Sequence, residues 1–371
     1  MVKRKKESFT DLHIFLGVIA ALIVIGFVFV YSSSSVYALE KFNSPHYYVK
    51  KQFIGFLVGL VGLFVLRILP IKFIKKISPL AFIGTLALTA MARLPQFAVR
   101  IHGSSRWLKL FGFTFQPSEM LKFALIVYVA YFIAKKQDDI SSFFRSYLPL
   151  LVVVGLTSLV LLSQPDFGLT VTICCTVFIL LYIAQFPPQY LIATLICLIP
   201  TGISLIYLKP YRFKRILTFL NPWADPKGSG FQIIQSLIAI GSGSFWGVGV
   251  SHSRQKFFYL PMQHTDFIFS IIAEETGFLG SMCLIFLFIS FAYFGVRVAL
   301  KLRDPFGMFA VLGFVVLTSL QAITNLAVTT GLIPTKGVGL PFVSYGSTAL
   351  VCSLAMVGLI INLVYTEKNK A

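Results

Sequence analysis

Charged residues are scarce in this sequence: Asp, Glu, Lys and Arg make up 12% of its 371 residues, whereas apolar residues make up 57%. Soluble domains carry about 25% charged residues, because a chain in water needs polar side chains over its whole exterior. The composition therefore excludes an ordinary soluble fold. It indicates a membrane protein, in which lipid surrounds many of the side chains.

Cysteine is also scarce, and its placement excludes a disulfide framework. The five cysteines all fall inside apolar runs, where a free cysteine behaves as a small hydrophobic residue. Their spacing matches neither paired disulfides nor a metal site. They are Cys174, Cys175, Cys197, Cys283 and Cys352.

Positive charge is in excess, with 32 Lys and Arg against 13 Asp and Glu. Proteins that bind nucleic acid gather basic residues on one face or arm of a polar domain. Here the basic residues stand between long apolar runs. We therefore expect no nucleic-acid partner.

Ten apolar stretches are candidates for transmembrane helices, because a helical span needs roughly 20 mostly apolar residues. They are 14–31, 53–69, 77–92, 120–134, 148–163, 169–186, 191–208, 267–299, 306–332 and 342–364. The first follows a basic segment and resembles a signal peptide, but it is longer than the apolar part of such peptides and has no evident cleavage motif. We expect it to be a retained span.

The loops predict the orientation. With the N-terminus in the cytoplasm, the short cytoplasmic loops and tails carry more Lys and Arg than the short outer loops, as the positive-inside rule requires. The sequence thus predicts an all-α polytopic membrane protein with about ten transmembrane helices and both termini in the cytoplasm. One large extracytoplasmic loop, at about 209–265, separates spans seven and eight. No linker or repeat of fixed period divides residues 1–371, so we expect a single domain.

The large outer loop contains an apolar segment, 228–243, that is bounded by glycines and is too short to cross the membrane. This pattern predicts a re-entrant or interfacial helix that covers a cavity above the bundle. The outer loops also carry many cations. Either an anionic extracytoplasmic ligand or the headgroups of anionic lipids would account for them.

Asp266 lies where the large loop enters an apolar stretch, in the sequence His-Thr-Asp-Phe. A carboxylate at this boundary, partly shielded from water and facing the cations of the loop, suits a general base. The alternative is that Thr265 or Asp266 caps the following helix.

Glu119 and Lys122 are three residues apart after Pro117, so one helix face should bring them together. They form either a structural ion pair within the bundle or part of the wall of an outward-facing cavity. Glu274 and Glu275 lie about two turns below Asp266, too deep to share a substrate atom with it. We expect them to pair with a buried cation such as Lys122.

Four further residues lie in segments that join the predicted spans. Asp166, in Gln-Pro-Asp-Phe-Gly, is either a helix cap or part of a site at an opened break between two spans, and Asp225 reads as a turn residue. His264 favours hydrogen bonding or loop packing over metal binding, because no third ligand is suitably spaced. Lys336 lies in a loop rich in Gly and Pro that either approaches a ligand or forms a sharp turn.

These segments together resemble the SEDS family, the bacterial cell-wall glycosyltransferases that include FtsW and RodA. The resemblance rests on six motifs in family order: Arg106-Trp107, 116–122, Gln164-Pro165-Asp166, 228–243, 260–275 and 332–346. Asn221-Pro222-Trp223 and 333–337 resemble the FtsW branch, which acts in division. One departure is Ser347, where the family commonly has glycine.

The resemblance implies a function. The chain would polymerise lipid II into β-1,4 glycan strands as an inverting glycosyltransferase and release undecaprenyl pyrophosphate, in septal cell-wall synthesis during cell division. It would work with a class B penicillin-binding protein and other division proteins, and Asp266 would be the catalytic residue. Candidates for substrate binding are Arg106, Glu119, Lys122, Asp166, Arg212, Arg215, His264, Lys336 and Ser344.

Other functions remain open at this point. A polymerase of cell elongation, a lipid II flippase and a scaffold for division proteins are the alternatives. A flippase should place ionisable groups near the midplane in broken helices and often has an internal repeat. The sequence requires no cofactor, but Mg²⁺ or Mn²⁺ could bridge a pyrophosphate through one or two carboxylates.

Overall fold

The computed structural model describes residues 2–94, 96, 98–101, 104–110, 113–256 and 260–370. The helices are α1 (Val2–Phe42), α2 (Tyr47–Ile68), α3 (Ile71–Met91), α4 (Pro117–Lys135), α5 (Leu148–Ser163), α6 (Phe167–Ile183), α7 (Pro188–Tyr207), α8 (Pro210–Leu220), α9 (Phe231–Ser242), α10 (Ile268–Lys301), α11 (Pro305–Thr329) and α12 (Ser347–Lys370). The strands are β1 (Ala98–Ile101), β2 (Ser104–Leu110) and β3 (Phe113–Phe115), and three short helical turns are η1 (Gln137–Asp139), η2 (Phe143–Tyr147) and η3 (Pro222–Ala224).

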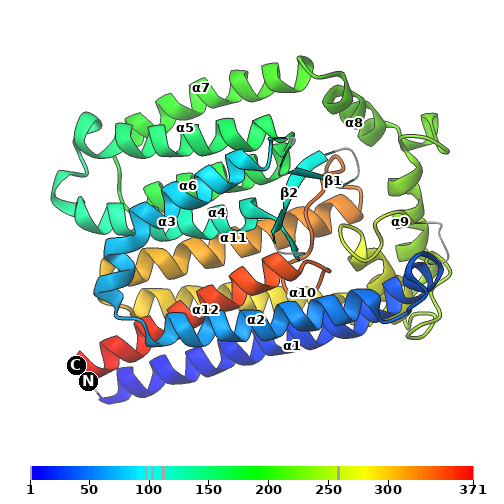
Figure 1. Cartoon of the computed structure of the whole chain (residues 1–371), viewed down its shortest axis with the longest axis horizontal. Helices are drawn as coiled ribbons and strands as arrows, with labels where there is room; N and C mark the ends of the chain where they lie inside the picture. The colour runs from blue at the N-terminus through cyan, green and yellow to red at the C-terminus, as the bar shows by residue number, and fades with distance from the viewer. Residues whose placement is uncertain are drawn as a thin grey trace.

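The long helices form one bundle in which both termini lie at the same end (Figure 1). Within the described residues, nine helices are long and apolar enough to cross a membrane, and α6, with 17 residues, is a shorter apolar helix in the same bundle. The prediction of about ten transmembrane helices is therefore confirmed. Termini at one end agree with an even number of crossings, whereas the side of the membrane on which they lie stays a prediction.

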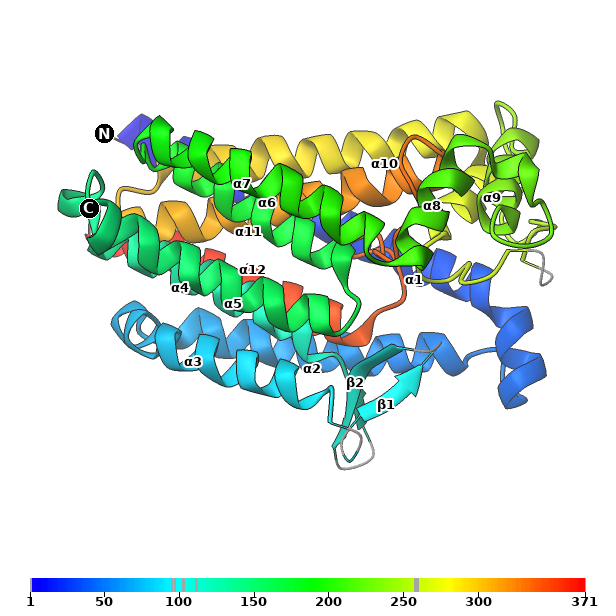
Figure 2. The ribbon, with the colours of Figure 1, turned by 90° about the horizontal axis from the view of Figure 1, so that it is seen from above.

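The opposite end of the bundle carries α8, α9 and the β-strands, and we call it the loop end (Figures 1 and 2). Residues 208–267, between α7 and α10, contribute α8, η3 and α9 to it. The 12-residue helix α9 corresponds to the short apolar helix expected in this segment.

A three-stranded antiparallel sheet, in the order β1-β2-β3, lies between α3 and α4 and was not expected from the sequence. Val99 pairs with Trp107, and Leu108 pairs with Phe115. Val99 is β-branched and Trp107 and Phe115 are aromatic, and residues of both kinds favour strands. The segment is too short and too polar to span a membrane, so the length of its apolar runs does not predict its structure.

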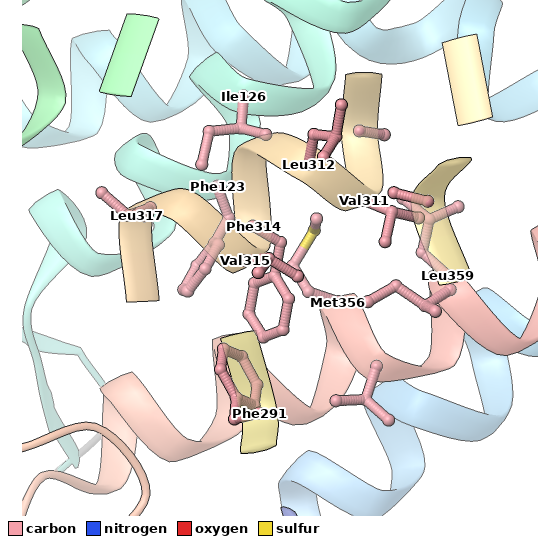
Figure 3. Packing of buried hydrophobic residues seen from close by; sticks show 14 of the residues in the cluster. Phe123, Ile126, Phe291, Val311, Leu312, Phe314, Val315, Leu317, Met356 and Leu359 are labelled. Atoms are coloured by element: carbon pink, nitrogen blue, oxygen red, sulfur yellow. The ribbon is translucent and has the colours of Figure 1, made fainter. Parts of the chain in front are cut away.

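Helix α11 is the centre of the bundle and packs against α4, α6, α9, α10 and α12. Figure 3 shows Phe314 of α11 among Phe123, Phe291 and Met356, which come from α4, α10 and α12. The rings of Phe291 and Phe314 meet edge to face, with centroids 6.0 Å apart. This packing fixes α11 and therefore the polar residues that it carries toward the loop end.

Helix α10 is broken, although the sequence predicted one continuous span. Gly277 has φ 65° and ψ −159°, outside the helical region. The segment 244–249 fills the break: the N–H of Phe278 donates to Ser244 O (2.9 Å), and the N–H of Val248 donates to Glu274 O (3.0 Å). Backbone groups that lose helical partners in an apolar surrounding must be bonded elsewhere, and this segment supplies the bonds.

Helices α2 and α12 approach each other closely along a row of small residues. A Cβ on Gly55 would lie 2.8 Å from Cβ of Ser347, and a Cβ on Gly59 would lie 2.6 Å from Cδ1 of Leu354. The spacing of four residues is the small-residue pattern of membrane helix pairs, where packing replaces the hydrophobic effect as the driving force. This contact ties α2 to the helix that follows the last loop.

We expect Gly59→Leu to destabilise the protein, because the added side chain must force α2 away from α12. Overpacking of this kind costs about 1–3 kcal/mol. The measurement is thermal unfolding of the full chain in detergent. Gly84→Leu is the matched control, since Gly84 is an exposed residue of α3 with nothing within 4 Å of its Cβ position. Equal effects of the two substitutions would contradict the importance of the contact.

Candidate functional site

Asp266 lies at the loop end, two residues before α10 begins at Ile268. It does not cap this helix: the N-cap residue is Phe267, and it has no capping bond from a side chain in the described structure. Burial raises the pKa of Asp266 to about 6; the charge of Asp166 also raises it, while Arg106 and Arg215 lower it. Such a carboxylate is ionised at neutral pH and still accepts a proton readily, as a general base must.

Gly337 lies beside the Asp266 carboxylate. A Cβ built on Gly337 would lie 3.3 Å from Oδ2 of Asp266, and Gly337 itself is exposed. The last loop therefore passes the carboxylate at a position that has no side chain.

Lys336 connects this loop to α6. Its Cβ and Cδ would lie 3.7 Å from a Cβ on Gly168, in the first turn of α6. Burial lowers the pKa of the Lys336 ammonium group. Lys336 forms no ion pair with any carboxylate of the described residues. A half-buried cation without a carboxylate partner is suited to bind an anion.

Arg106 and Asp166 form an ion pair next to this group. Nη1 of Arg106 lies 3.4 Å from Oδ2 of Asp166, and the same guanidinium donates to the carbonyls of Gln164 (3.0 Å) and Pro165 (2.7 Å). Oδ1 of Asp166 accepts from the N–H of Leu169 (3.2 Å) and caps α6. The cap predicted from the sequence is confirmed. Burial raises the pKa of Asp166, and Arg106 opposes this shift.

The structure thus brings together Arg106, Asp166 and Asp266, which come from β2, the start of α6 and the start of α10. Lys336 adjoins them through the last loop, as the residue before Gly337, and its charge acts on Cys175 of α6. Arg215 of α8 joins them, because its Nη1 donates to the carbonyl of Thr335, next to Lys336 (3.1 Å). These five residues form the candidate site. Its three cations outnumber its two carboxylates, so the site favours an anionic ligand.

Arg212 and His264 have other surroundings. The guanidinium of Arg212 donates to the carbonyl of Leu205 (2.9 Å) and lies over the ring of Phe167 (5.0 Å), so it joins α8 to α7 and α6. His264 is buried among aromatic rings, with Tyr48 at 4.3 Å and Tyr345 at 5.8 Å between centroids. This agrees with the loop-packing interpretation of His264.

Glu119 and Lys122 meet as their spacing predicts, with Nζ of Lys122 2.6 Å from Oε2 of Glu119. Lys122 also donates to Oε1 of Gln321 on α11 (3.3 Å) and is 3% exposed. Both charges act on the nearby Asp166. The pair therefore lies below the candidate site, inside the bundle.

The expectation that Glu274 and Glu275 pair with a buried cation is confirmed for Glu275, but the cation is Lys256 and the example given, Lys122, is wrong. Glu275 lies 3.8 Å from Nζ of Lys256 and accepts from the hydroxyl of Ser32 (2.6 Å). Glu274 accepts from the N–H of Arg254 (2.9 Å) and from the hydroxyl of Ser253. The partners come from the long segment between α9 and α10 and from α1, which fold back onto the broken helix, so helical spacing could not reveal them.

Two residues hold the main chain of Asp266 and its neighbours. Ser344, expected to bind substrate, donates to the carbonyl of Thr265 (2.6 Å) and accepts from the N–H of Leu340 (2.7 Å). Asn325 of α11 donates to the carbonyls of both Asp266 and Val338 (2.7 Å each). The sequence analysis missed Asn325. A polar residue inside a predicted span was the signal that could have drawn attention to it.

No cluster of three or more His, Cys, Asp or Glu side chains suited to a metal ion is found in the described part of the chain. Mg²⁺ and Mn²⁺ can bind through one or two carboxylates together with phosphate oxygens. Asp266 fits this role better than Asp166, whose oxygens are engaged by Arg106 and by the N–H of Leu169. Binding of either ion stays a prediction.

Comparison with known proteins gives consistent matches over nearly the whole chain. A family model described as the cell cycle proteins FtsW, RodA and SpoVE matches residues 12–369. The probable peptidoglycan glycosyltransferase FtsW of Geobacter sp. strain M18 is 39% identical over 360 residues, which cover 97% of this chain and 98% of the relative. The stage V sporulation protein E of Bacillus subtilis strain 168 is 37% identical and covers 92% of this chain and 93% of the relative.

Solved structures give the same picture. A chain from a peptidoglycan synthase complex, described as coordinating polymerization and crosslinking, superposes with a TM-score of 0.77 at 26% identity, over 95% of this chain and 97% of that one. The rod shape determining protein RodA of Thermus thermophilus superposes with a TM-score of 0.69 at 22% identity, over 96% and 97%. The second likeness shows a shared fold.

We expect Asp166→Ala to lower the thermal stability of the protein more than Asp166→Asn. Asparagine still caps a helix, whereas alanine does not, and the lost cap is worth about 1 kcal/mol. Both variants lose the ion pair with Arg106, so the difference between them reports the cap. The measurement is thermal unfolding in detergent, and equal losses would show that the cap contributes nothing.

Proposed function

Because the chain belongs to the family of FtsW, RodA and SpoVE, we propose that it is a peptidoglycan glycosyltransferase that polymerises lipid II into β-1,4 glycan strands. One observation carries the proposed chemistry: the part-buried carboxylate of Asp266 lies at the loop end, where Arg106 and Arg215 act on it and Lys336 belongs to the adjoining loop. Base and cations are the two functions that this reaction requires.

Asp266 acts as the general base in this proposal. Its carboxylate accepts the proton of the acceptor sugar's 4-hydroxyl group, while the hydroxyl oxygen forms a bond to the anomeric carbon of the donor. The bond between that carbon and the pyrophosphate oxygen breaks, and its electron pair leaves with undecaprenyl pyrophosphate. Attack from the face opposite the leaving group inverts the anomeric configuration.

The cations stabilise the leaving group. Negative charge develops on the pyrophosphate as its bond to the sugar breaks, and preorganised donors are most effective where such charge appears. Lys336 and Arg215 are held together by the bond from Arg215 to Thr335. Arg106 is oriented by Asp166 and by two carbonyls. We assign the binding of the pyrophosphate group to the side chains of Lys336, Arg215 and Arg106.

We place the loop end on the outer side of the membrane and both termini in the cytoplasm. The positive-inside rule supports this orientation. It also puts Asp266 at the boundary where a lipid-linked sugar enters from the bilayer and the growing strand leaves.

The related peptidoglycan synthase complex, which couples polymerization with crosslinking, supports a crosslinking class B penicillin-binding protein as partner. Similarity to FtsW proteins favours a role in division over elongation.

Lipid transport is the second candidate function, because the break in α10 carries two buried carboxylates, and transporters place ionisable groups in broken helices. The chain's own segments occupy this break. Residues 244–249 bond its backbone, and Lys256, Ser253 and Ser32 bond its carboxylates. These contacts favour a structural role for the break and support the glycosyltransferase.

We expect Asp266→Asn to abolish glycan synthesis, because the amide keeps the shape of the side chain but cannot accept the proton. For the wild type, kcat/KM should fall as the pH drops below about 6, since burial raises the pKa of Asp266 to about 6 and protonation removes the base. The measurement is polymerisation of labelled lipid II by the purified protein with its class B partner.

Asp225→Asn is the matched control for this experiment. Asp225 lies in the same loop, but its carboxylate is exposed: it accepts from the N–H and hydroxyl of Ser229 in a turn (2.9 Å and 3.0 Å) and lies 3.8 Å from Nζ of Lys214. The control should retain activity. Wild-type activity in Asp266→Asn would remove Asp266 from the mechanism, and a lipid II translocation assay would then test the transport function.

Neutralising Lys336 should slow the reaction without unfolding the bundle. Loss of one preorganised donor to a developing charge typically costs roughly 100-fold in rate. We therefore expect kcat/KM of Lys336→Met to fall by about that factor, with partial recovery in Lys336→Arg. Lys227→Met is the control, because Lys227 is an exposed lysine between η3 and α9 at the loop end. An unstable, aggregated Lys336→Met protein would instead indicate a structural role.

A further inference from the structure

Three consecutive carbonyls lead into the proposed base, and each accepts a hydrogen bond from the C-terminal part of the chain. The carbonyl of His264 accepts from the N–H of Tyr345 (2.9 Å), and that of Thr265 accepts from the hydroxyl of Ser344 (2.6 Å). The carbonyl of Asp266 accepts from Nδ2 of Asn325 (2.7 Å). Asp266 is therefore held through its main chain, while its carboxylate remains available.

Asn325 differs from the other two donors because it lies on a rigid helix. Ser344 and Tyr345 belong to the last loop, whereas Asn325 belongs to α11, the centre of the bundle, and is 1% exposed. Its second N–H donates to the carbonyl of Val338 (2.7 Å). One amide group thus joins three parts of the protein: the core helix, the segment that ends in Asp266 and the loop that carries Lys336 and Gly337.

The chemistry of the side chain explains why this residue is an asparagine. Two N–H groups on one nitrogen are needed to bond two carbonyls at once, and no alcohol or carboxylate offers them. The amide oxygen, by contrast, is buried and has no hydrogen-bond partner among the described residues. A buried oxygen without a partner costs free energy, so the benefit of this asparagine lies in its two donors.

We infer that Asn325 is a positioning residue for catalysis: it holds the base Asp266 and the Lys336 loop at a fixed separation, so that one carboxylate and one cation face the same substrate. This inference rests on the proposed role of Asp266. Reacting groups must be held to a fraction of an ångström, and a displacement of about 1 Å can cost 100-fold in rate.

The test compares two asparagines with the same bonding pattern at opposite ends of the molecule. Asn362 of α12 also donates from Nδ2 to two carbonyls, those of Leu66 and Leu69 (2.8 Å and 2.7 Å), at the end of α2 near the termini. Asn325→Ala and Asn362→Ala therefore remove equivalent bonds, one pair beside the site and one pair far from it. Kinetics with labelled lipid II and thermal unfolding are measured for both.

For Asn325→Ala we expect kcat to fall about 100-fold, because Asp266 and the Lys336 loop lose their common anchor. KM for lipid II should change little, because Arg106 and Arg215 stay on other elements. The acid limb of its pH–rate profile should also move to lower pH. A loosened Asp266 gains water, while Arg106, Arg215 and Asp166, the charged groups that act on it, stay on other elements. Asn362→Ala should keep wild-type kcat and an unchanged profile.

Several results would overturn the inference. One is a kcat within twofold of wild type in Asn325→Ala, and another is an equal loss of kcat in the two alanine variants. If Asn325→Ala does not fold, Ser344→Ala takes its place, because it removes the neighbouring hydrogen bond to the carbonyl of Thr265. This variant should lower kcat and leave KM unchanged. A wild-type kcat in Ser344→Ala would refute the positioning of Asp266 through its main chain.

The inference and the proposed function fail in different ways. An active Asp266→Asn protein would refute the proposed base. An inactive Asp266→Asn protein together with a fully active Asn325→Ala protein would refute the positioning role alone.

Discussion

The candidate site depends on one polar stripe in an otherwise apolar, buried helix. Gln321, Asn325 and Thr329 follow one another at every fourth residue of α11 and therefore lie on one face. The first two side chains bond other parts of the chain: Gln321 accepts from Lys122, and Asn325 donates to the carbonyls of two loops. The hydroxyl of Thr329 donates to the main chain of α11, and its carbonyl accepts from Ser236 of α9. The surrounding aromatic core fixes α11, and α11 in turn fixes the loops.

Irregular backbone near a membrane is stable only where other groups satisfy its hydrogen bonds. The protein meets this requirement twice. At the break in α10, segment 244–249 replaces the missing helical partners. At the loop end, Asn325 and Ser344 bond the carbonyls that precede α10. In both places a few polar groups determine the course of a long segment, so the geometry of the site is set by hydrogen bonds more than by apolar packing.

Features that depend on neighbours within one helical turn could be predicted from the sequence. The Glu119–Lys122 pair and the Asp166 cap are of this kind, and the spans followed from apolar length alone. Membrane helices are apolar on most sides, so periodicity does not tell which face meets which neighbour. For this reason the bonds of Asn325, the partners of Glu274 and Glu275 and the use of Ser344 by the main chain emerged only in the folded chain.

Gly337 sets the clearance above the proposed base. The position that its missing Cβ would occupy is 3.3 Å from Oδ2 of Asp266, about the length of a hydrogen bond. An acceptor hydroxyl that gives its proton to Oδ2 therefore needs the same volume that any larger residue would fill. A larger residue at position 337 would therefore take up space beside Oδ2 of Asp266 and leave the charge of the carboxylate unchanged.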